Sequence, residues 1–176
     1  DISNISRVDE GEFEYHFSMG TVSDILDELI KNFELNIEQQ KLIVIRNDKS
    51  GELPPVMRDR EKFGLALRNI LDNAIKYTPQ GGQITVGVYE RDKFLNITIA
   101  DTGIGIPEKD KELLFNKSYR APNAVLLHTE GSGLGLFFAK SIIDKHNGRL
   151  LLESTEGKGT IFTIILPTDQ EHMPGR

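Results

Sequence analysis

The chain has 176 residues, which is enough for one domain with a proper hydrophobic core and too few for two large ones. Its 21 basic and 27 acidic residues give a formal net charge of −6, which argues against nonspecific binding to nucleic acid or to an anionic membrane surface. The chain has no cysteine, which excludes disulfides and thiolate zinc sites, and no apolar run approaches the length of a membrane span.

The first third of the chain predicts a strand, a long helix and two further short strands. Aromatic residues alternate with other residues over residues 12–18, which predicts a strand. An amphipathic helix is expected over about 21–39, with Thr21 as its N-cap. Its inward stripe consists of Ile25, Leu26, Leu29, Ile30 and Phe33. We expect strands at 42–45 and 56–57, joined by a loop that contains Gly51 and two prolines.

The middle of the chain predicts a second long helix followed by a hairpin. Apolar residues recur with helical period over residues 59–77, and Pro79 with the two glycines after Gln80 is a strong stop signal. Residues 83–89 and 94–100 alternate with period 2 on either side of the polar stretch 90–93. They predict an antiparallel pair of strands.

Beyond this hairpin the periodic signal weakens and then returns. A short helix is expected at 108–114. Residues 116–130 have no sustained period, and they predict a long loop that becomes ordered only when it is needed for function. A third long helix is expected over 133–146, with Asn147 and Gly148 ending it.

The last strands close the predicted domain. Residues 149–154 and 160–166 predict a hairpin, and residues 168–176 predict a frayed tail. The elements together predict one α+β domain, built as a mixed, largely antiparallel sheet with helices on one face.

The helix predicted over 59–77 has two distinct faces. One carries the apolar residues Phe63, Leu67, Ile70, Leu71 and Ala74. The other carries Asn69, Asn73, Lys76 and Tyr77. Asparagine is a poor helix former, so two of them one turn apart suggest a purpose other than helix formation. The side-chain oxygen of asparagine is a neutral, hard ligand, and it suits a Mg²⁺ ion whose other ligands are phosphate oxygens and water. The alternative is a solvated face with a chance pair of asparagines.

Two glycine clusters follow this helix, at residues 101–107 and 131–136. Glycine lets backbone N–H groups approach a ligand and permits the positive φ angles that turn several amides toward one anion. Two clusters on either side of an aperiodic segment therefore predict a nucleotide site. The P-loop pattern is excluded, because Leu152 stands where its first glycine belongs, and the second cluster lacks the spacing of a dinucleotide motif.

These motifs resemble, in order, those of the catalytic ATP-binding domain of bacterial sensor histidine kinases, in the wider family shared with gyrase, the ninety-kilodalton heat-shock chaperone and MutL. They are an N box at 69–78, a first glycine box at 101–105, an F box at Phe115, a second glycine box at 131–136 and a final segment at 156–162. The resemblance implies a two-layer α/β sandwich, the Bergerat fold. Its sheet is mixed and mostly antiparallel, with three long helices on one face and an ATP lid over 116–130.

The resemblance implies ATP and Mg²⁺ as cofactors and indicates which residues would bind each of them. Asp101 would accept a hydrogen bond from the adenine amino group, assisted by Thr160, although an aspartate before Gly103 can also simply start a turn. Asn73 would be the metal ligand. The residues implied in binding the nucleotide are Asn69, Asn73, Lys76, Tyr77, Asp101, Gly103, Gly105, Ile106, Phe115, Tyr119, Arg120, Gly131, Ser132, Gly133, Leu134, Gly135, Leu136 and Thr160.

The catalytic residues implied are Asn69, Lys76 and Arg120. The guanidinium of Arg120 suits a γ-phosphate, and the alternative is an exposed loop arginine. Lys76 can also be explained as a cation in the last turn of its helix, and Gly135 as a site of close packing. The F box departs from the family pattern, because Ser118 stands where a second aromatic residue is common. The lid is therefore expected to pack less firmly.

Asn69 favours phosphoryl transfer over hydrolysis. In the ATPase branches of the family, a glutamate one turn before the metal-binding asparagine acts as general base toward water. A neutral amide cannot do this, so weak hydrolysis is expected. Transfer to histidine needs no such base, because neutral imidazole is already a nucleophile.

The resemblance also divides the chain and supplies its partners. Residues 1–11 resemble the tail of a dimerisation hairpin, 12–167 form the catalytic domain and 168–176 a flexible tail. None of the four histidines is followed by Glu, so the acceptor is expected on dimerisation helices outside this chain, with a response regulator downstream. Since the chain begins at Asp1 without a Met, we expect a fragment of a longer protein, and the resemblance implies a cytoplasmic domain of a larger, membrane-anchored sensor. The alternatives are a serine-protein kinase of the anti-sigma-factor type and a non-catalytic nucleotide sensor that docks a partner.

Overall fold

The computed structural model describes residues 14–48, 53–128, 131–169 and 171–174. The predicted hairpin remnant at 1–11 lies outside them. Among the described residues, no helix is both long enough and apolar enough to cross a bilayer.

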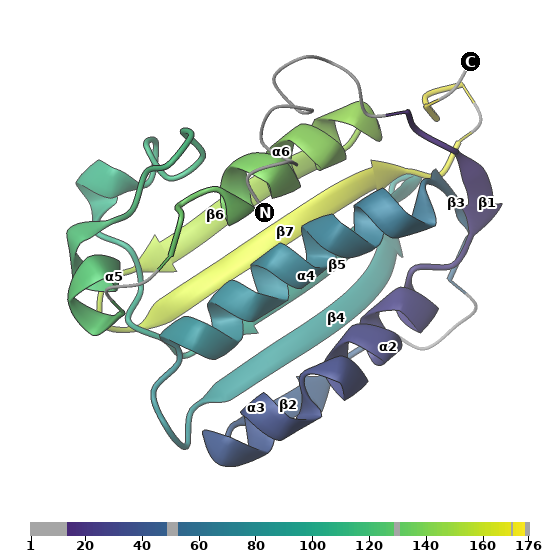
Figure 1. The fold of residues 1–176 in the computed structure, drawn as a ribbon. Coiled ribbons are helices and arrows are strands. Elements are labelled where there is room, and N and C mark those ends of the chain that lie inside the picture. Colours follow the sequence, from purple (N-terminus) through teal and green to yellow (C-terminus); the bar gives the residue numbers. More distant parts are fainter. Residues whose placement is uncertain (1–13, 49–52, 129–130, 170, 175–176) are drawn as a thin grey trace.

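The fold is a two-layer sandwich in which helices cover one face of a five-stranded sheet (Figure 1). The strand order is β2-β4-β5-β7-β6, in which β2 is parallel to β4 and all other neighbours are antiparallel. These strands are β2 Ile43–Arg46, β4 Gln83–Arg91, β5 Phe94–Asp101, β6 Arg149–Thr155 and β7 Gly159–Pro167. This confirms the predicted mixed, largely antiparallel sheet.

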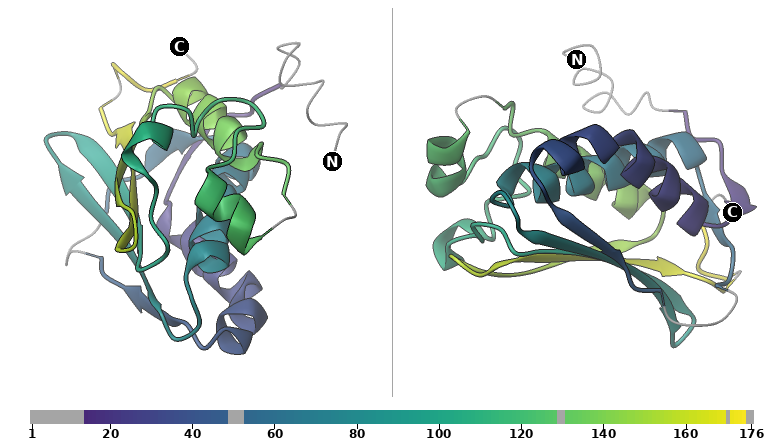
Figure 2. Two further views of the ribbon diagram at one scale, coloured as in Figure 1. Left: turned by 90° about the vertical axis from the view of Figure 1, so that its left-hand side faces the viewer. Right: turned by 90° about the horizontal axis from the view of Figure 1, so that it is seen from below.

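The long helices lie side by side on one face of the sheet, and the opposite face is bare of helices (Figure 2). They are α2 Ser23–Asn32, α4 Arg60–Tyr77 and α6 Gly135–Lys145. The remaining elements are short: α3 Glu34–Gln39, a 3₁₀ turn at Glu108–Asp110, α5 Pro122–Leu127, and the antiparallel pair β1 Ser18–Gly20 and β3 Val56–Arg58. Helix α5 lies apart from the three long helices, at one end of the molecule (Figure 1).

Helix α4 is the centre of the core. Its predicted apolar stripe is buried, and Phe63, Leu67 and Ile70 have no exposed surface. Asp59 caps its first turn by accepting a hydrogen bond from the Lys62 amide at 2.9 Å. At the other end the Thr78 hydroxyl donates to the Ala74 carbonyl, and Pro79 follows, so the chain leaves the helix where the sequence predicted.

The predicted strand at 12–18 is wrong over residues 14–17. The strand here is β1, and residues 14–17 precede it without pairing as a strand. The rings of Tyr15 and Phe17 stack on each other, 5.6 Å apart, and both pack edge-on to His146. The alternation therefore reflects one aromatic cluster and not the two faces of a sheet.

The helix predicted over 21–39 is two helices, α2 and α3, which meet at Phe33. Phe33 is buried in the core and leaves helical geometry, with φ −94° and ψ 3°. Thr21 is not the N-cap. Val22 holds that position, and the Thr21 hydroxyl instead donates to the Asp24 carboxylate at 2.8 Å.

Two expectations for the segment between β5 and α6 need correction. The helix expected at 108–114 is only a 3₁₀ turn followed by further turns. The segment 116–130, predicted to be an irregular loop, contains α5. Helix α5 buries none of its residues, and so it leaves no apolar period in the sequence.

The hairpin loops are shorter than predicted. Asp92 and Lys93, both with positive φ, form a two-residue connection, so β4 extends into the polar stretch 90–93 as far as Arg91. In the described part of the tail, the Thr168 amide donates to the Lys93 carbonyl at 2.9 Å, and Met173 is buried.

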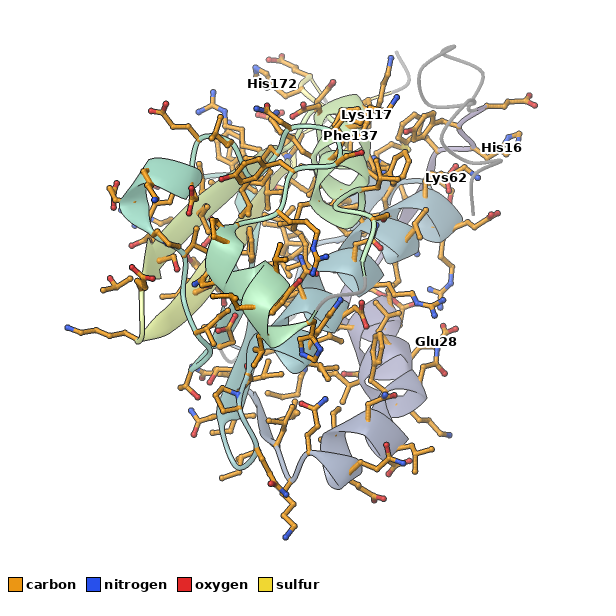
Figure 3. All side chains as sticks on the ribbon, turned by 60° about the vertical axis from the view of Figure 1, so that its left-hand side comes forward. His16, Glu28, Lys62, Lys117, Phe137 and His172 are labelled. Atoms are coloured by element: carbon orange, nitrogen blue, oxygen red, sulfur yellow. The ribbon has the colours of Figure 1, made fainter. Side chains whose placement is uncertain are left out.

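His146 joins three segments at the end of the molecule opposite α5. Its Nδ1 lies 2.7 Å from the Ile142 carbonyl of α6, and its Nε2 accepts from the Asp59 amide at 3.0 Å. Since a carbonyl only accepts and an amide only donates, the ring is neutral with its proton on Nδ1. Asp59 in turn accepts from the amides of His16 and Lys62, which lie at this end of α4 (Figure 3). Burial lowers the pKa of His146, although Asp59 nearby opposes the shift.

We expect His146 to titrate below the value of about 6.5 for an unfolded histidine. The unfolded state then binds more protons than the folded state as the pH falls below about 6.5. The free energy of unfolding should therefore decrease on acidification, by at most about 1.4 kcal/mol per pH unit from this group. NMR titration of the ring measures the pKa, and its nitrogen shifts report the tautomer.

The control is His146→Gln, which removes the titrating group. Urea unfolding should show a less stable variant at about pH 7, with a shallower loss of stability toward about pH 5.5 than the wild type. An imidazole that titrates as in an unfolded chain would contradict the neutral, doubly bonded ring.

Candidate nucleotide site

A cavity of about 270 Å³ lies between the C-terminal half of α4, the ends of β5 and β7, the segment before and within α5, and the start of α6. Most of the predicted site residues line it. They are Asn69, Asn73, Lys76, Tyr77, Asp101, Gly105, Ile106, Tyr119, Arg120, Gly131, Ser132, Gly133, Gly135, Leu136 and Thr160. The fold thus brings together motifs that lie far apart in the sequence.

Three predicted residues do not line the cavity and instead support its walls. Gly103 donates its amide to Asp101 Oδ1, and a Cβ here would lie 2.6 Å from the Tyr77 carbonyl oxygen. Phe115 packs against the hydrophobic core. Leu134 is buried just before α6.

One end of the cavity is built around Asp101, the last residue of β5. It pairs with Thr160 across the antiparallel ladder, and its Oδ1 accepts from the Gly103 amide at 2.8 Å and the Thr160 amide at 3.2 Å. Burial raises the pKa of this carboxyl to about 6, while the two amide hydrogen bonds act in the opposite direction. Among the described residues no donor reaches Oδ2, so the carboxyl retains a free acceptor.

Gly105 and Ser154 close this end of the cavity. Gly105 has φ +65°, and a Cβ on it would lie 2.0 Å from the Thr155 carbonyl oxygen. Only a glycine at this position lets the loop after β5 come so close to strand β6. The Ser154 hydroxyl fixes the approach, because it accepts from the Ile106 amide and lies 2.9 Å from the Thr160 hydroxyl. Sequence reasoning missed Ser154, which appears only as a polar residue in a strand.

The other end of the cavity lies where α4 and α6 meet. Asn69 and Asn73 both face it from α4, with Lys76 one turn further on. Gly135 begins α6, and a Cβ on it would lie 3.6 Å from the Asn69 side chain. Amide oxygens, a lysine and the first N–H groups of a helix therefore share one corner, a combination suited to anionic oxygens and a small cation.

The segment 119–128, which contains α5, forms a lid held to the domain by side chains. The Tyr119 hydroxyl donates to Asp110 Oδ1 at 2.7 Å. His128 Nε2 donates to the Lys76 carbonyl at 2.8 Å, and its ring lies edge-on to Tyr77. The Arg120 guanidinium donates to the backbone carbonyl of His128 and also approaches that of Gly131.

Several cavity residues were not predicted. They are Asp72, Ile104, Leu114, Ala121, Asn123, Ala124 and Phe162. Ile104 stands between two glycines of the first box and Phe162 two residues after Thr160, so the motifs themselves pointed to both. Asn123 carried no signal, because it lies in the aperiodic segment.

The model of the family described as histidine kinase-, DNA gyrase B-, and HSP90-like ATPase matches residues 58–170. The chain belongs to this family. It is 36% identical over 173 residues to the sensor histidine kinase WalK of Bacillus subtilis, a match that covers 97% of this chain and 28% of WalK. It is 33% identical over 168 residues to the adaptive-response sensory kinase SasA of Microcystis aeruginosa, covering 95% of this chain and 43% of SasA. The chain thus spans less than half of either relative.

Solved structures of the family have the same fold. The nucleotide-free catalytic domain of the histidine kinase ThkA superposes with a TM-score of 0.77 at 26% identity, covering 89% of this chain and 99% of that one. Full-length ShkA in complex with AMPPNP superposes with a TM-score of 0.80 at 19% identity, and the match covers 94% of this chain and 34% of the ShkA chain. ThkA in complex with the response regulator TrrA superposes with a TM-score of 0.75 at 22% identity, and the match covers 97% of this chain and 49% of that chain. The predicted fold class is confirmed.

Asp101 gives a direct test of the cavity's electrostatics. Its carboxyl should titrate near pH 6, far above the unfolded value of about 3.9. Between these values the folded state binds more protons than the unfolded state. The stabilising contribution is therefore complete below about pH 4 and is lost as the pH rises through 6.

Carbon NMR of the side-chain carboxyl measures this pKa in the nucleotide-free protein. Asp101→Asn keeps the shape and should lose both the resonance and this part of the pH dependence of stability. A carboxyl that titrates near its unfolded value would show that Asp101 is solvated and not enclosed.

Proposed function

We propose that this chain binds Mg²⁺-ATP and donates the γ-phosphoryl group to a histidine on the dimerisation helices of a sensor histidine kinase. The observation that carries the proposal is the joint lining of one cavity by Asn69 and Asn73, by Asp101, and by the glycines before α6. The similarity of nearly the whole chain to WalK and SasA supports it.

The adenine ring is assigned to the Asp101 end. A carboxylate with a free oxygen accepts from the 6-amino group of adenine, whereas guanine would present a carbonyl there and leave two acceptors facing each other. Thr160, whose hydroxyl lies within hydrogen-bonding distance of Ser154, assists at the base directly or through water. Adenine binding should favour the ionised carboxylate and so lower the pKa of Asp101.

The phosphates are assigned to the corner between α4 and α6. Gly131, Gly133 and Gly135 offer backbone amides there, and α6 adds the partial positive charge of its N-terminus. Lys76 adds a full charge. Asn73, with Asn69 beside it, offers the neutral oxygen that suits Mg²⁺, whose remaining ligands are phosphate oxygens and water. The bound ion would neutralise charge that develops on the phosphoryl oxygens.

Asn69 supports transfer over hydrolysis. It lines the cavity one turn before Asn73, where a general base toward water would have to stand, and its amide cannot take a proton. Arg120 is assigned to the γ-phosphate. It lines the same cavity, and phosphate oxygens can replace the His128 and Gly131 carbonyls as its acceptors with stronger, charge-assisted hydrogen bonds.

The acceptor histidine is assigned to helices outside this chain. His146 has both ring nitrogens engaged in the core, and His128 is bonded to the end of α4. A response regulator is the expected downstream partner, as the complex of ThkA with TrrA suggests. We infer a cytoplasmic position in a larger, membrane-anchored sensor from the similarity to the sensor kinases WalK and SasA, of which this chain spans less than half.

Transfer can be tested by mixing the chain with the dimerisation hairpin of its own full-length protein and γ-labelled ATP. The label should appear on the hairpin in an acid-labile, base-stable linkage, as expected of phosphohistidine, and a hairpin with its histidine changed to Gln should stay unlabelled. Tight ATP binding without any transfer would favour the non-catalytic sensor. Acid-stable label on serine of a protein partner would favour the anti-sigma-factor type of kinase.

The metal site has its own test in Asn73→Ala. We expect the affinity for ATP in the presence of Mg²⁺ to fall by at least about tenfold, because the metal loses a ligand. The affinity without Mg²⁺ should change little. Calorimetric titration with and without Mg²⁺ measures both.

Asn36→Ala is the matched control, since Asn36 is an exposed helical asparagine in α3 and does not line the cavity. Alanine is favourable in either helix, so neither change should impair folding. Equal Mg²⁺ dependence in wild type and Asn73→Ala would refute the metal assignment.

A further inference from the structure

Asn123, the second residue of α5, lines the nucleotide cavity with a half-satisfied amide. Its Nδ2 donates to the Gly105 carbonyl at 3.0 Å, which ties the lid to the loop after β5. Its Oδ1 is buried and has no hydrogen-bond partner among the described residues. Buried side-chain oxygens usually have a donor, so this atom needs an explanation.

The orientation of the amide follows from its neighbour. The Gly105 carbonyl can only accept, so the NH₂ group must face it. The reverse orientation would place two acceptors 3.0 Å apart. Oδ1 is therefore directed away from Gly105 and is left for some other donor.

The lid around Asn123 is anchored on both sides of it. Tyr119 is bonded to Asp110 before α5, and His128 is bonded to the Lys76 carbonyl after it. Together with the bond to Gly105, these contacts fix where the Asn123 side chain stands. The unpaired oxygen therefore belongs to a defined position of the lid next to the cavity.

The missing donor can come from only one part of ATP. At neutral pH the phosphate oxygens are almost entirely acceptors, whereas adenosine carries N–H donors on its 6-amino group and O–H donors on its ribose. Gly105, to which Asn123 is bonded, lies in the short loop that directly follows Asp101, at the adenosine end of the proposed site. Asn123 and these donors are thus at the same end of the cavity.

We propose that Asn123 is a specificity-determining residue of the lid, whose Oδ1 accepts a hydrogen bond from an N–H or O–H group of the bound adenosine. This inference rests on the proposed binding of ATP. With Nδ2 on Gly105 and Oδ1 on the nucleotide, one side chain links the lid to both the domain and its ligand. The lid then recognises the nucleoside as well as covering the phosphates.

The test is a comparison of dissociation constants for ATP and for analogues that each lack one donor. Purine riboside triphosphate lacks the 6-amino group, and 2′-deoxy-ATP and 3′-deoxy-ATP each lack one ribose hydroxyl. Asn123→Ala should weaken ATP binding by roughly five- to tenfold, the effect of one buried hydrogen bond. For the analogue without the recognised donor, the same substitution should have little further effect, and this identifies base or ribose.

Two further variants separate recognition from lid structure. Asn123→Asp retains an acceptor but cannot donate to Gly105, so it should keep the wild-type ratio of affinities between ATP and that analogue even where both bind more weakly. Leu126→Ala is the control, since Leu126 lies on the same helix with 87% of its surface exposed. It should leave all affinities unchanged.

Two results would overturn the proposal. One is an unchanged ATP affinity in Asn123→Ala, and the other is an equal loss for ATP and every analogue, which would show that Asn123 only holds the lid. A wild-type chain that binds no ATP would instead refute the proposed function itself.

Discussion

Helix α4 has to bury one stripe of side chains completely while it presents another to the cavity, and the orientation of the asparagines that line the cavity depends on this. Its apolar stripe is sealed against the sheet, with Phe63 and Leu67 fully buried. Because side chains on a helix keep a fixed angular relation, that burial fixes the direction of Asn69 and Asn73 as well. The free energy of the hydrophobic core thus orients the proposed metal site, although neither asparagine contributes to the core.

The Asp101 end of the cavity depends on a different constraint, the close approach of two backbones. Gly105 and Gly159 both have positive φ, and a Cβ on either would lie 2.0 Å from a carbonyl oxygen of the facing segment. These contacts bring the loop after β5 against the turn between β6 and β7. Asp101 is thereby enclosed, and the cost of burying its charge raises its pKa to about 6. The glycines therefore shape the site chiefly by permitting packing, beside any amides they offer to phosphate.

The two ends of α4 are held by different polar contacts. At its start, His146 and Asp59 join α4 to α6 and to the segment around His16. At its end, the Lys76 carbonyl receives the lid through His128. One helix thus connects the segment around His16 to the lid beside the cavity. Its geometry is well suited to a domain whose proposed activity requires an upstream helical hairpin and a bound nucleotide to be positioned relative to each other.

The sequence by itself determined the features that rest on local chemistry. The helix at 59–77 with its two faces, the strand pair after it and the glycine boxes could all be predicted, because helical period, alternation and turn residues are local signals. Asp101 and Thr160 were identified by motif, and the antiparallel register of β5 and β7 then placed them opposite each other.

Only the tertiary structure decided features that depend on contacts between distant segments. The break at Phe33 arises where a buried side chain leaves helical geometry, and the alternation at 14–17 serves an aromatic cluster around His146. None of the residues of helix α5 is buried as a whole, so the helix leaves no apolar period to detect. The proposed role of Asn123 depends on its hydrogen bond to the carbonyl of Gly105, eighteen residues away in the sequence. Hydrophobic periodicity records which face of an element is buried, but it carries no information about which distant polar group a side chain will meet. That pairing is fixed only when the elements pack.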